Sequence, residues 1–225
     1  MNYKIDTRPI WDAYRSGCCC PLCQVQEEVE RRQLGLYLNE AVMEPVYRTE
    51  VNKSGFCARH AGELAAMKTA DKNSCGLALQ LSTRSAYVRG ALKATHSAKA
   101  AKREAERAAA LASSCVICAH TDDAMERYAE TAARMYAREP DFSKLFAGAK
   151  AYCLSHYALL LAHSGKAGNK TRELCSDAYK IMDNALCHAV DNLDKYCALF
   201  DYRGASGGDA PAVRAAVPDA LKLLK

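Results

Sequence analysis

Apolar residues along this chain recur mostly at steps of three and four positions, the period of an α-helix. Two segments, about 24–43 and about 122–138, show this spacing most clearly. Their apolar positions are Val25, Val29, Leu36 and Met43 in the first and Met125, Tyr128, Ala132 and Met135 in the second. A proline follows each segment, Pro45 and Pro140, and would end the helix. Because no β-branched run alternates with polar residues as a strand requires, the pattern predicts an all-α fold.

A longer apolar series predicts one long helix in each half of the chain. In the second half it steps by four and three residues through Cys175, Tyr179, Met182, Leu186, Ala189, Leu193, Tyr196 and Phe200. This 3.5-residue period is typical of a helix that packs along a seam. In the first half the matching positions are all alanine: Ala91, Ala94, Ala98, Ala101, Ala105, Ala108 and Ala112. Alanine admits a close neighbouring helix, but its high helix propensity also suits an exposed helix, and both interpretations stay open.

One cysteine–histidine pattern occurs twice, and its two copies start 95 residues apart, at Cys20 and at Cys115. The spacings are C-x2-C-x33-C-x2-H and C-x2-C-x34-C-x2-H. Three thiolates and one imidazole form the ligand set of a closed tetrahedral zinc site. The repetition therefore predicts two zinc ions. The predicted ligands are Cys20, Cys23, Cys57 and His60 in the first copy and Cys115, Cys118, Cys153 and His156 in the second.

The repeat also predicts how the chain is organised. Residues 1–112 would form a first Cys3His helical repeat and residues 113–203 a second, with a tail at 204–225 that carries glycine and proline and ends in a short helix. The stretch between the two ligand pairs of a copy is long enough for a helix and its return. Each metal would thus pin a helical hairpin, each hairpin would lead into a long helix, and the two long helices would pack together in one unit.

Other chemistry at these motifs stays open. Three cysteines and one histidine can also hold an iron–sulfur cluster, although the chain lacks the short C-x2-C-x2-C run of bacterial ferredoxins. A catalytic zinc keeps one position for water, whereas four strong ligands close both sites. The sequence shows no Ser/His/Asp or Cys/His catalytic arrangement and no glycine-rich phosphate loop. Zinc is therefore favoured over iron–sulfur, and a non-catalytic role over an enzyme.

Several residues outside the matched sets are further candidates. Cys18, Cys19 and His120 lie beside predicted ligands and are spare metal ligands. Cys20 is favoured over its two neighbours because it reproduces the C-x2-C spacing of the second copy. Two interpretations of Cys187-His188 stay open: a reactive or metal-binding pair, or two residues with only a structural role. The trio Asp201-Tyr202-Arg203 follows the long helix. It either closes a pocket or caps the end of the helix, with the tail packed against it.

Composition and charge narrow the setting. The chain has 225 residues, 12 cysteines and a net charge of +5, which two Cys3His zinc sites would lower to about +3. Residues 1–17 lack the apolar core of a secretory signal, and no apolar run is long enough for a membrane helix, so we expect a cytoplasmic protein with reduced thiols and no membrane contact. A basic stretch (Lys93, Lys99, Lys102, Arg103, Arg107) is broken by two glutamates and lacks stacking aromatics, which favours a solvated helix face over a nucleic-acid surface.

The motifs also resemble those of a known family. The segments Cys20-Pro21-Leu22-Cys23, Ser54-Gly55-Phe56-Cys57-Ala58-Arg59-His60 and Tyr152-Cys153-Leu154-Ser155-His156-Tyr157 are similar to a bacterial family of unknown function that is widespread in Firmicutes. Phe200-Asp201-Tyr202-Arg203 and the terminal helix extend the resemblance over nearly the whole chain. It implies a cytoplasmic, mostly helical protein with paired Cys/His sites and brings no assigned activity. The chain departs from the family in its alanine-rich middle and in Cys18 and Cys19.

These observations favour a zinc-stabilised scaffold or binding module with a protein partner that the sequence does not identify. Three alternatives remain: a thiol-based redox or metal sensor, an iron–sulfur or metal-dependent enzyme, and a nucleic-acid-binding protein. The sequence indicates no particular oligomeric state.

Overall fold

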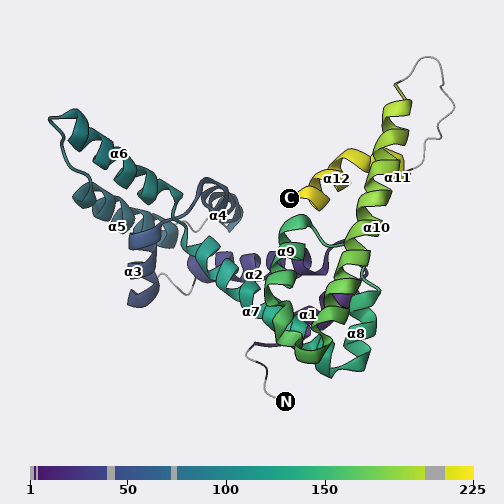
Figure 1. The fold of residues 1–225 in the computed structure, drawn as a ribbon. Coiled ribbons are helices and arrows are strands. Elements are labelled where there is room, and N and C mark those ends of the chain that lie inside the picture. Colours follow the sequence, from purple (N-terminus) through teal and green to yellow (C-terminus); the bar gives the residue numbers. More distant parts are fainter. Residues whose placement is uncertain (1–2, 4, 40–43, 72–74, 201–210) are drawn as a thin grey trace. The chain divides into compact units, whose positions relative to one another are not determined.

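The computed structural model describes residues 3, 5–39, 44–71, 75–200 and 211–225, and it contains helices and no strand in those residues (Figure 1). The all-α prediction is confirmed. The helices are α1 (Arg8–Arg15), α2 (Pro21–Leu38), α3 (Pro45–Ser54), α4 (Ala58–Asp71), α5 (Cys75–Ala91), α6 (Ala98–Ser113), α7 (Val116–Arg138), α8 (Pro140–Ala147), α9 (Leu154–His163), the 3-10 helix η2 (Ser164–Lys170), α10 (Thr171–Ala198), α11 (Pro211–Arg214) and α12 (Ala216–Leu224). No described helix has the length and apolar character needed to cross a membrane.

The chain forms two compact units. Unit 1 combines Met1–Glu27 with Ala124–Lys225, and unit 2 is Glu28–Asp123. Helix α2 begins in unit 1 and ends in unit 2, whereas α7 begins in unit 2 and ends in unit 1. The segments 1–112, 113–203 and 204–225 stay a prediction about the sequence repeat, and the compact units follow other boundaries.

Prolines and cysteines set the helix boundaries near the metal-binding motifs. Pro45 and Pro140 each occupy the first turn of a helix, α3 and α8, and the residue before each proline is extended. This fits the steric clash that keeps a residue before proline out of the helical conformation. Helices α4 and α9 begin directly after Cys57 and Cys153, so the predicted helix at each C-x2-H motif is confirmed.

Unit 1 has an aromatic core that includes Tyr152, the residue before the Cys153 motif. The rings of Tyr14 and Phe142 meet edge to face with centroids 5.0 Å apart, and those of Phe146 and Tyr152 are 5.6 Å apart. The buried hydroxyls of Tyr14 and Tyr152 share a hydrogen bond of 3.1 Å. Because Tyr152 immediately precedes Cys153, this core fixes the backbone from which that cysteine projects.

Unit 2 has a separate core beneath the other motifs. Its buried members are Leu34, Tyr37, Leu38, Val51, Leu64, Leu77, Cys115, Val116 and Ile117, with Phe56, Cys57 and Cys118 packed against them. The side chain of Arg84 in α5 joins the ends of two helices, α3 and α6, since its guanidinium donates to the carbonyls of Asn52, Lys53 and Leu111 at 2.6–2.9 Å. Two of the cysteine motifs therefore belong to the packed interior of this unit.

The long helix of the second half forms as predicted, and its buried face follows the predicted seam only in part: Met182 is buried, and Leu186 and Ala189 pack against the same core cluster. In α10 the buried residues are Leu174, Ala178, Ile181 and Met182. Tyr179, a predicted seam position, is 59% exposed. Leu174 and Ala178 form an apolar series of their own beside Cys175 and Tyr179. The neighbours of α10, which include η2, α8, α11 and α12, decide which of its apolar residues are covered, and the spacing alone does not.

The predicted long helix of the first half is wrong. Helix α5 ends at Ala91, residues 92–97 are not helical, and α6 starts after Ser97, whose hydroxyl accepts a hydrogen bond from the Ala100 N–H. The serine is a helix N-cap that the alanine series obscured. No residue of α6 is buried, which favours the exposed-helix interpretation of the alanines. Because α6 and α10 belong to different units, their packing together stays a prediction.

One glycine at the start of a motif is required by the backbone. Gly55 has φ +65° and ψ −155°, a combination that only glycine adopts readily, and a Cβ there would lie 2.9 Å from the Arg84 side chain. We expect Gly55→Ala to lower the free energy of unfolding by about 1–3 kcal/mol. The matched control is Gly62→Ala in α4, where a Cβ meets nothing within 4 Å.

Gly62→Ala should raise the stability by about 0.5–1 kcal/mol, since glycine weakens a helix interior. Urea denaturation of both variants checks the pair. Equal effects of the two substitutions would contradict the strain at Gly55.

Candidate metal centres

The eight predicted ligands lie in two groups of four, but the membership of the groups differs from the prediction. The first group, here called the Cys20 site, contains Cys20, Cys23, Cys153 and His156, all from unit 1. The second, the Cys57 site, contains Cys57, His60, Cys115 and Cys118, all from unit 2. Each site joins the C-x2-C of one sequence copy to the C-x2-H of the other. The prediction that each copy closes its own site is therefore wrong.

The lengths of the intervening helices explain the exchange. After the first C-x2-C, α2 carries the chain about 27 Å, at 1.5 Å per residue, and α3 is long enough for only about 15 Å of return. After the second C-x2-C, α7 covers about 35 Å and α8 only about 12 Å. To bring the C-x2-H back to the C-x2-C of the same sequence copy, the return helix would need to be about as long as the outgoing one. Instead, each long helix delivers the following C-x2-H to the other unit.

The Cys20 site is built from the starts of two helices. Cys20 precedes α2 and Cys23 lies in its first turn, while Cys153 is the N-cap of α9 and His156 lies in its first turn. The His156 Nδ1 atom is 3.6 Å from Cys20 Sγ, 3.4 Å from Cys23 Sγ and 3.1 Å from Cys153 Sγ. The Sγ atoms of Cys23 and Cys153 are 3.6 Å apart. The Ala151 N–H donates to the Cys19 carbonyl at 3.0 Å and joins the two segments.

The Cys57 site repeats this construction in unit 2. Cys57 precedes α4, which carries His60, and Cys115 precedes α7, which carries Cys118. The His60 Nδ1 atom is 3.3–3.4 Å from the Sγ atoms of its three cysteine partners. The Sγ atoms of Cys57 and Cys118 are 3.9 Å apart. Here the Val116 N–H donates to the Gly55 carbonyl at 3.0 Å and again joins the two segments.

The ligand atoms of each site all lie within 4.8 Å of one another, as one metal ion requires. In both sites the histidine presents Nδ1 to the thiols. His60 is fully buried and His156 is 5% exposed, so water does not compete strongly for either imidazole. Both groups are thus able to hold a metal ion through three thiolates and one imidazole.

Within each site the thiol before the C-x2-H helix is the one most favoured as a thiolate. The thiols of Cys20 and Cys23 donate to Cys153 and hold its pKa far below the usual value, and the pKa of Cys20 is raised correspondingly. Burial opposes ionisation of Cys57, but the backbone N–H groups of His60 and Arg59, together with two neighbouring thiols, lower its pKa. A metal ion would replace the protons that the thiols share.

The two histidines differ in their charge environment. Burial lowers the pKa of His156, but the thiols of Cys153 and Cys23 raise it more strongly, to about 9. Burial and the neighbouring Arg59 lower the pKa of His60. The neutral imidazole that a metal binds is therefore already favoured at the Cys57 site, whereas at the Cys20 site the metal must displace a proton.

Glu30 and Arg59 surround the outer side of the Cys57 site. The His60 Nε2 atom is buried without a hydrogen bond, and the nearest carboxylate oxygen recorded is Glu30 Oε1 at 3.9 Å. Glu30 also pairs with Arg59 at 2.8 Å. A carboxylate behind a metal-binding histidine orients the ring and raises its basicity. Sequence reasoning missed Glu30, because only the folded unit brings α2 beside α4.

We expect Glu30→Ala to weaken metal binding at the Cys57 site by roughly 10–100-fold and to leave the Cys20 site unchanged. The measurement is metal competition with a chromophoric chelator. The matched control is Glu63→Ala, which removes the other carboxylate that pairs with Arg59, at 3.4 Å, but leaves Glu30 behind the imidazole. Equal weakening by both substitutions would show that Glu30 acts through Arg59 and not on His60.

The Cys20 site opens onto a cleft of about 480 Å³. The lining residues are Cys18, Cys19, Cys20, Cys23, Gln24, Glu27, Cys153, Lys222, Leu223 and Lys225. The last turn of α12 is held there because the backbone N–H and the hydroxyl of Ser155 both donate to the Lys225 carbonyl, at 3.0 and 2.7 Å. Burial is the largest single influence on the pKa of Lys225 and lowers it, but Cys23, Cys153 and Glu27 together raise this pKa above its usual value. Of the three thiol ligands of this site, Cys23 is half-buried beside these basic side chains, whereas Cys20 and Cys153 are buried.

The remaining sequence candidates lie outside both groups of ligands. The His120 Nε2–H donates a 3.0 Å hydrogen bond to the Glu50 carboxylate, and His120 does not join Cys118. Cys18 contacts the Ala13 carbonyl at 3.6 Å. His188 and Cys19 line a second, mostly apolar cavity of about 190 Å³ in unit 1, whereas Cys187 is exposed. The trio Asp201-Tyr202-Arg203 lies outside the described residues.

Comparison with other proteins gives a family but no activity. Neither the curated proteins nor the solved structures contain a match to this chain. The model of one family, described as "Family of unknown function (DUF6062)", matches residues 1–225, so the chain belongs to that family.

Proposed function

We propose that this protein is a zinc-stabilised helical scaffold or binding module that presents a surface to a protein partner. The observation that carries the proposal is the spacing of the ligand atoms. Tetrahedral zinc with usual bond lengths separates two sulfurs by about 3.8 Å and a sulfur from a nitrogen by about 3.6 Å. The recorded S–S distances are 3.6 and 3.9 Å, and the S–N distances are 3.1–3.6 Å. Four protein ligands leave no coordination position for a substrate, which fits a structural role.

The same spacing favours a single ion over an iron–sulfur cluster. A cluster places its ligands on different iron atoms, with the inorganic core between them, so its cysteines stand farther apart than those of a mononuclear site. Both groups here are as compact as one ion requires. Among single ions, such a site binds zinc more tightly than ferrous iron. Zinc thiolate sites need reduced cysteines, which supports a cytoplasmic setting.

Metal content tests this proposal directly. Protein purified without oxygen is examined by native mass spectrometry, and an absorbance spectrum of the same sample is recorded. We expect two zinc ions per chain and no visible colour. Iron accompanied by sulfide would overturn the zinc assignment, and a single metal per chain would show that one of the two sites is not built to hold an ion.

The cleft favours a second candidate function, a thiol-based redox sensor at the Cys20 site. A peroxide can oxidise the Cys23 and Cys153 thiolates, whose sulfurs are 3.6 Å apart. The two thiolates form a disulfide and give up two electrons. Hydrogen peroxide accepts these electrons and two protons from solvent and becomes two molecules of water. The zinc ion keeps only two protein ligands and dissociates. The ligands of the Cys57 site line none of the four cavities of about 190, 240, 290 and 480 Å³ in the described residues, although its Cys57 and Cys118 thiols are half-buried.

We therefore expect hydrogen peroxide to release zinc from the Cys20 site at least tenfold faster than from the Cys57 site. A chromophoric chelator reports the release, and peptide mapping of the oxidised protein should find the first disulfide between Cys23 and Cys153. Release of both ions at one rate, or a first disulfide in the Cys57 site, would contradict a sensor at the Cys20 site.

A further inference from the structure

The cleft beside the Cys20 site contains more thiols than one metal ion needs. Five of its ten lining residues are cysteines: the three ligands Cys20, Cys23 and Cys153, together with Cys18 and Cys19. The Cys57 site has no comparable surroundings, since its ligands line neither this cleft nor the cavities of about 190, 240 and 290 Å³. An ion at the Cys20 site therefore lies beside two thiols that are not among its four ligands.

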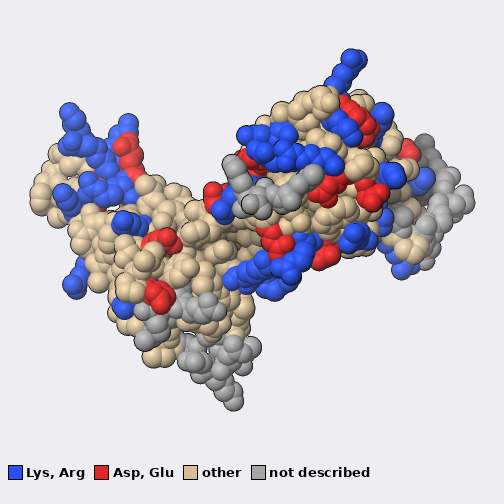
Figure 2. All heavy atoms as spheres, turned by 90° about the horizontal axis from the view of Figure 1, so that it is seen from below, with Lys and Arg blue, Asp and Glu red and all other residues tan. Residues whose placement is uncertain are grey.

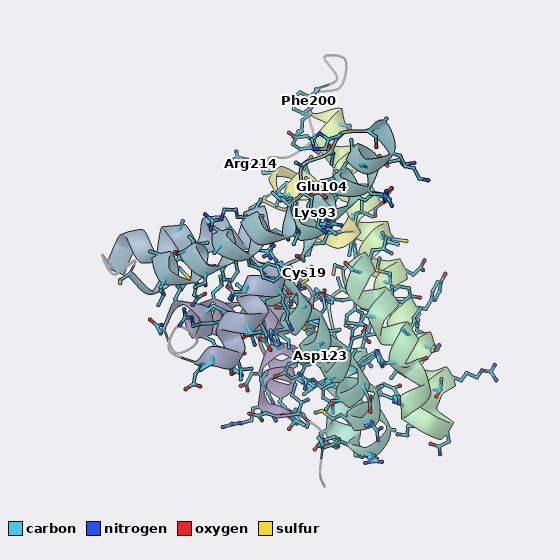
Figure 3. The ribbon with its side chains drawn as sticks, turned by 90° about the vertical axis from the view of Figure 1, so that its left-hand side faces the viewer. Cys19, Lys93, Glu104, Asp123, Phe200 and Arg214 are labelled. Carbon is cyan, nitrogen blue, oxygen red and sulfur yellow. The ribbon has the colours of Figure 1, made fainter. Side chains whose placement is uncertain are left out.

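Of these two thiols, Cys19 is the one that is free to bind an ion. The Cys18 sulfur contacts the Ala13 carbonyl at 3.6 Å. Cys19 is exposed, and its sulfur forms no hydrogen bond within the residues that the structure describes. Its backbone is fixed, because the Cys19 carbonyl accepts the Ala151 N–H at 3.0 Å. Figure 3 marks Cys19 close to the yellow ribbon of α12, which forms another wall of the cleft.

Two lysines of the C-terminal segment favour an anionic thiolate in this cleft. Lys222 and Lys225 both line it, and the one acidic lining residue is Glu27. Lys225 lies beside the Cys23 thiol, and Lys222 pairs weakly with Asp219 at 3.5 Å. Figure 2 shows basic and acidic side chains interspersed over the face of unit 1 on its right, so that face presents no broad positive surface. The local pair of cations suits a small anion better than a polyanion.

We propose that the Cys20 site exchanges its zinc with low-molecular-weight thiols, and that Cys19 is the ligand through which the ion enters and leaves. This inference rests on the proposed zinc sites and adds zinc transfer to the structural role of one of them. The Cys57 site, which borders no such cleft, holds its ion as a structural one. The thiol that receives the ion passes it to any stronger zinc ligand in solution.

The exchange is a substitution of one thiolate by another. Zinc can expand from four to five ligands, so an entering sulfur binds before the leaving one departs. A Zn–S bond to Cys19 forms, the Zn–S bond to Cys23 breaks, and the proton of the Cys19 thiol passes to the Cys23 sulfur. No electron is transferred. Cys23 is the leaving ligand because it is half-buried, whereas Cys20 and Cys153 are buried.

Cys19 is a temporary ligand and does not belong to the resting site. Its sulfur lies outside the group of four ligand atoms that gather within 4.8 Å of one another. Burial is the main cause that raises the pKa of its thiol, and Asp219 and Cys23 raise this pKa further. The four resting ligands therefore set the affinity for zinc, and Cys19 changes only the rate at which the ion moves.

The test measures zinc release in the absence of an oxidant. Protein that holds two zinc ions is kept anaerobic, glutathione is added as the entering thiol, and a chromophoric chelator captures the zinc that glutathione removes. Release should occur in two phases of one ion each. The rate of the fast phase should rise in proportion to the glutathione concentration and exceed that of the slow phase at least tenfold.

Variants of the full chain assign the fast phase. Cys19→Ser should slow it at least tenfold, while the zinc content stays at two and the affinity in chelator competition stays within twofold. The matched controls are Cys187→Ser, which removes another exposed thiol of unit 1, and Cys18→Ser; each should change the rate less than twofold. In Cys20→Ser/Cys153→Ser only the slow phase should remain, because that variant lacks the Cys20 site.

Three results would overturn the inference. Release of both ions at rates that do not depend on glutathione would exclude exchange with thiols. An unchanged fast phase in Cys19→Ser would remove Cys19 from the path of the ion. A lower zinc content of Cys19→Ser would show that Cys19 is a resident ligand. Unaltered protein without two zinc ions would instead refute the zinc sites themselves, so the failure of exchange and the failure of the proposed function are distinguishable.

Discussion

Removal of both metal ions should abolish the cooperative unfolding transition of this protein. Each site joins segments that are remote in sequence: Cys23 and Cys153 are 130 residues apart, and Cys57 and Cys118 are 61 apart. Without a metal, each site leaves three thiols and an imidazole packed together, and their mutual hydrogen bonds replace much stronger metal–ligand bonds.

The expected size of this effect exceeds the stability of a typical domain. Structural zinc contributes about 10–16 kcal/mol to folding. The net free energy of unfolding of a natural protein is only about 5–15 kcal/mol. Loss of one ion should therefore unfold the unit that holds it. The long helices α7 and α10 can keep part of their helicity, since local hydrogen bonds form without tertiary contacts, but they would no longer melt together.

Circular dichroism at 222 nm during a thermal scan measures this loss. The chelated protein should show reduced helicity and a broad, non-cooperative decline, and two equivalents of zinc should restore a sharp transition. The controls are Cys75→Ser and Cys187→Ser, which remove exposed cysteines outside both sites and should keep two zinc ions and the sharp transition. Metal-free protein that melts cooperatively at an unchanged temperature would contradict a structural role for the metals.

The fold class and the eight residues that gather in the two Cys/His groups could be predicted from the sequence because both depend on local patterns. Helical spacing predicted α2, α7 and α10. The spacing Cys20–Cys23 and Cys57–His60 places two ligands on one turn whatever the rest of the chain does. Residue type and short spacing therefore identified all eight members of the two clusters.

The grouping of the ligands is not a local property. Cys20 has an equally good C-x2-H motif at Cys57 and at Cys153, and spacing along the chain favours the nearer one. The direction and length of α2 and α7 decide between them. Similarly, Leu174 and Cys175 begin two apolar series of the same period, and the neighbours of α10 bury Leu174, Ala178 and Ile181 of the first but Met182 of the second. Ser97 shows the opposite case, a local cap within a regular alanine series.

The exchanged grouping predicts opposite outcomes for two double variants. In Cys20→Ser/Cys153→Ser both substitutions fall in the Cys20 site, so the Cys57 site keeps all four ligands and should retain one zinc ion. In Cys20→Ser/Cys57→Ser each site loses one thiolate, so neither stays complete. We expect native mass spectrometry after a challenge with a strong chelator to find one zinc ion in the first variant and none in the second.

A grouping within each sequence copy would reverse this result, because Cys20 and Cys57 would then share a site and Cys20 and Cys153 would not. Both variants carry two Cys→Ser changes, and Cys20→Ser is common to them, so a general effect of losing thiols cannot produce the difference.

The exchange also connects the two units along the chain: α2 and α7 each start at one site and lead to the ligands of the other site. Unfolding of one unit therefore frees one end of both helices, and the variant that keeps the Cys57 site should melt at a lower temperature than the unaltered protein even though unit 2 retains every ligand.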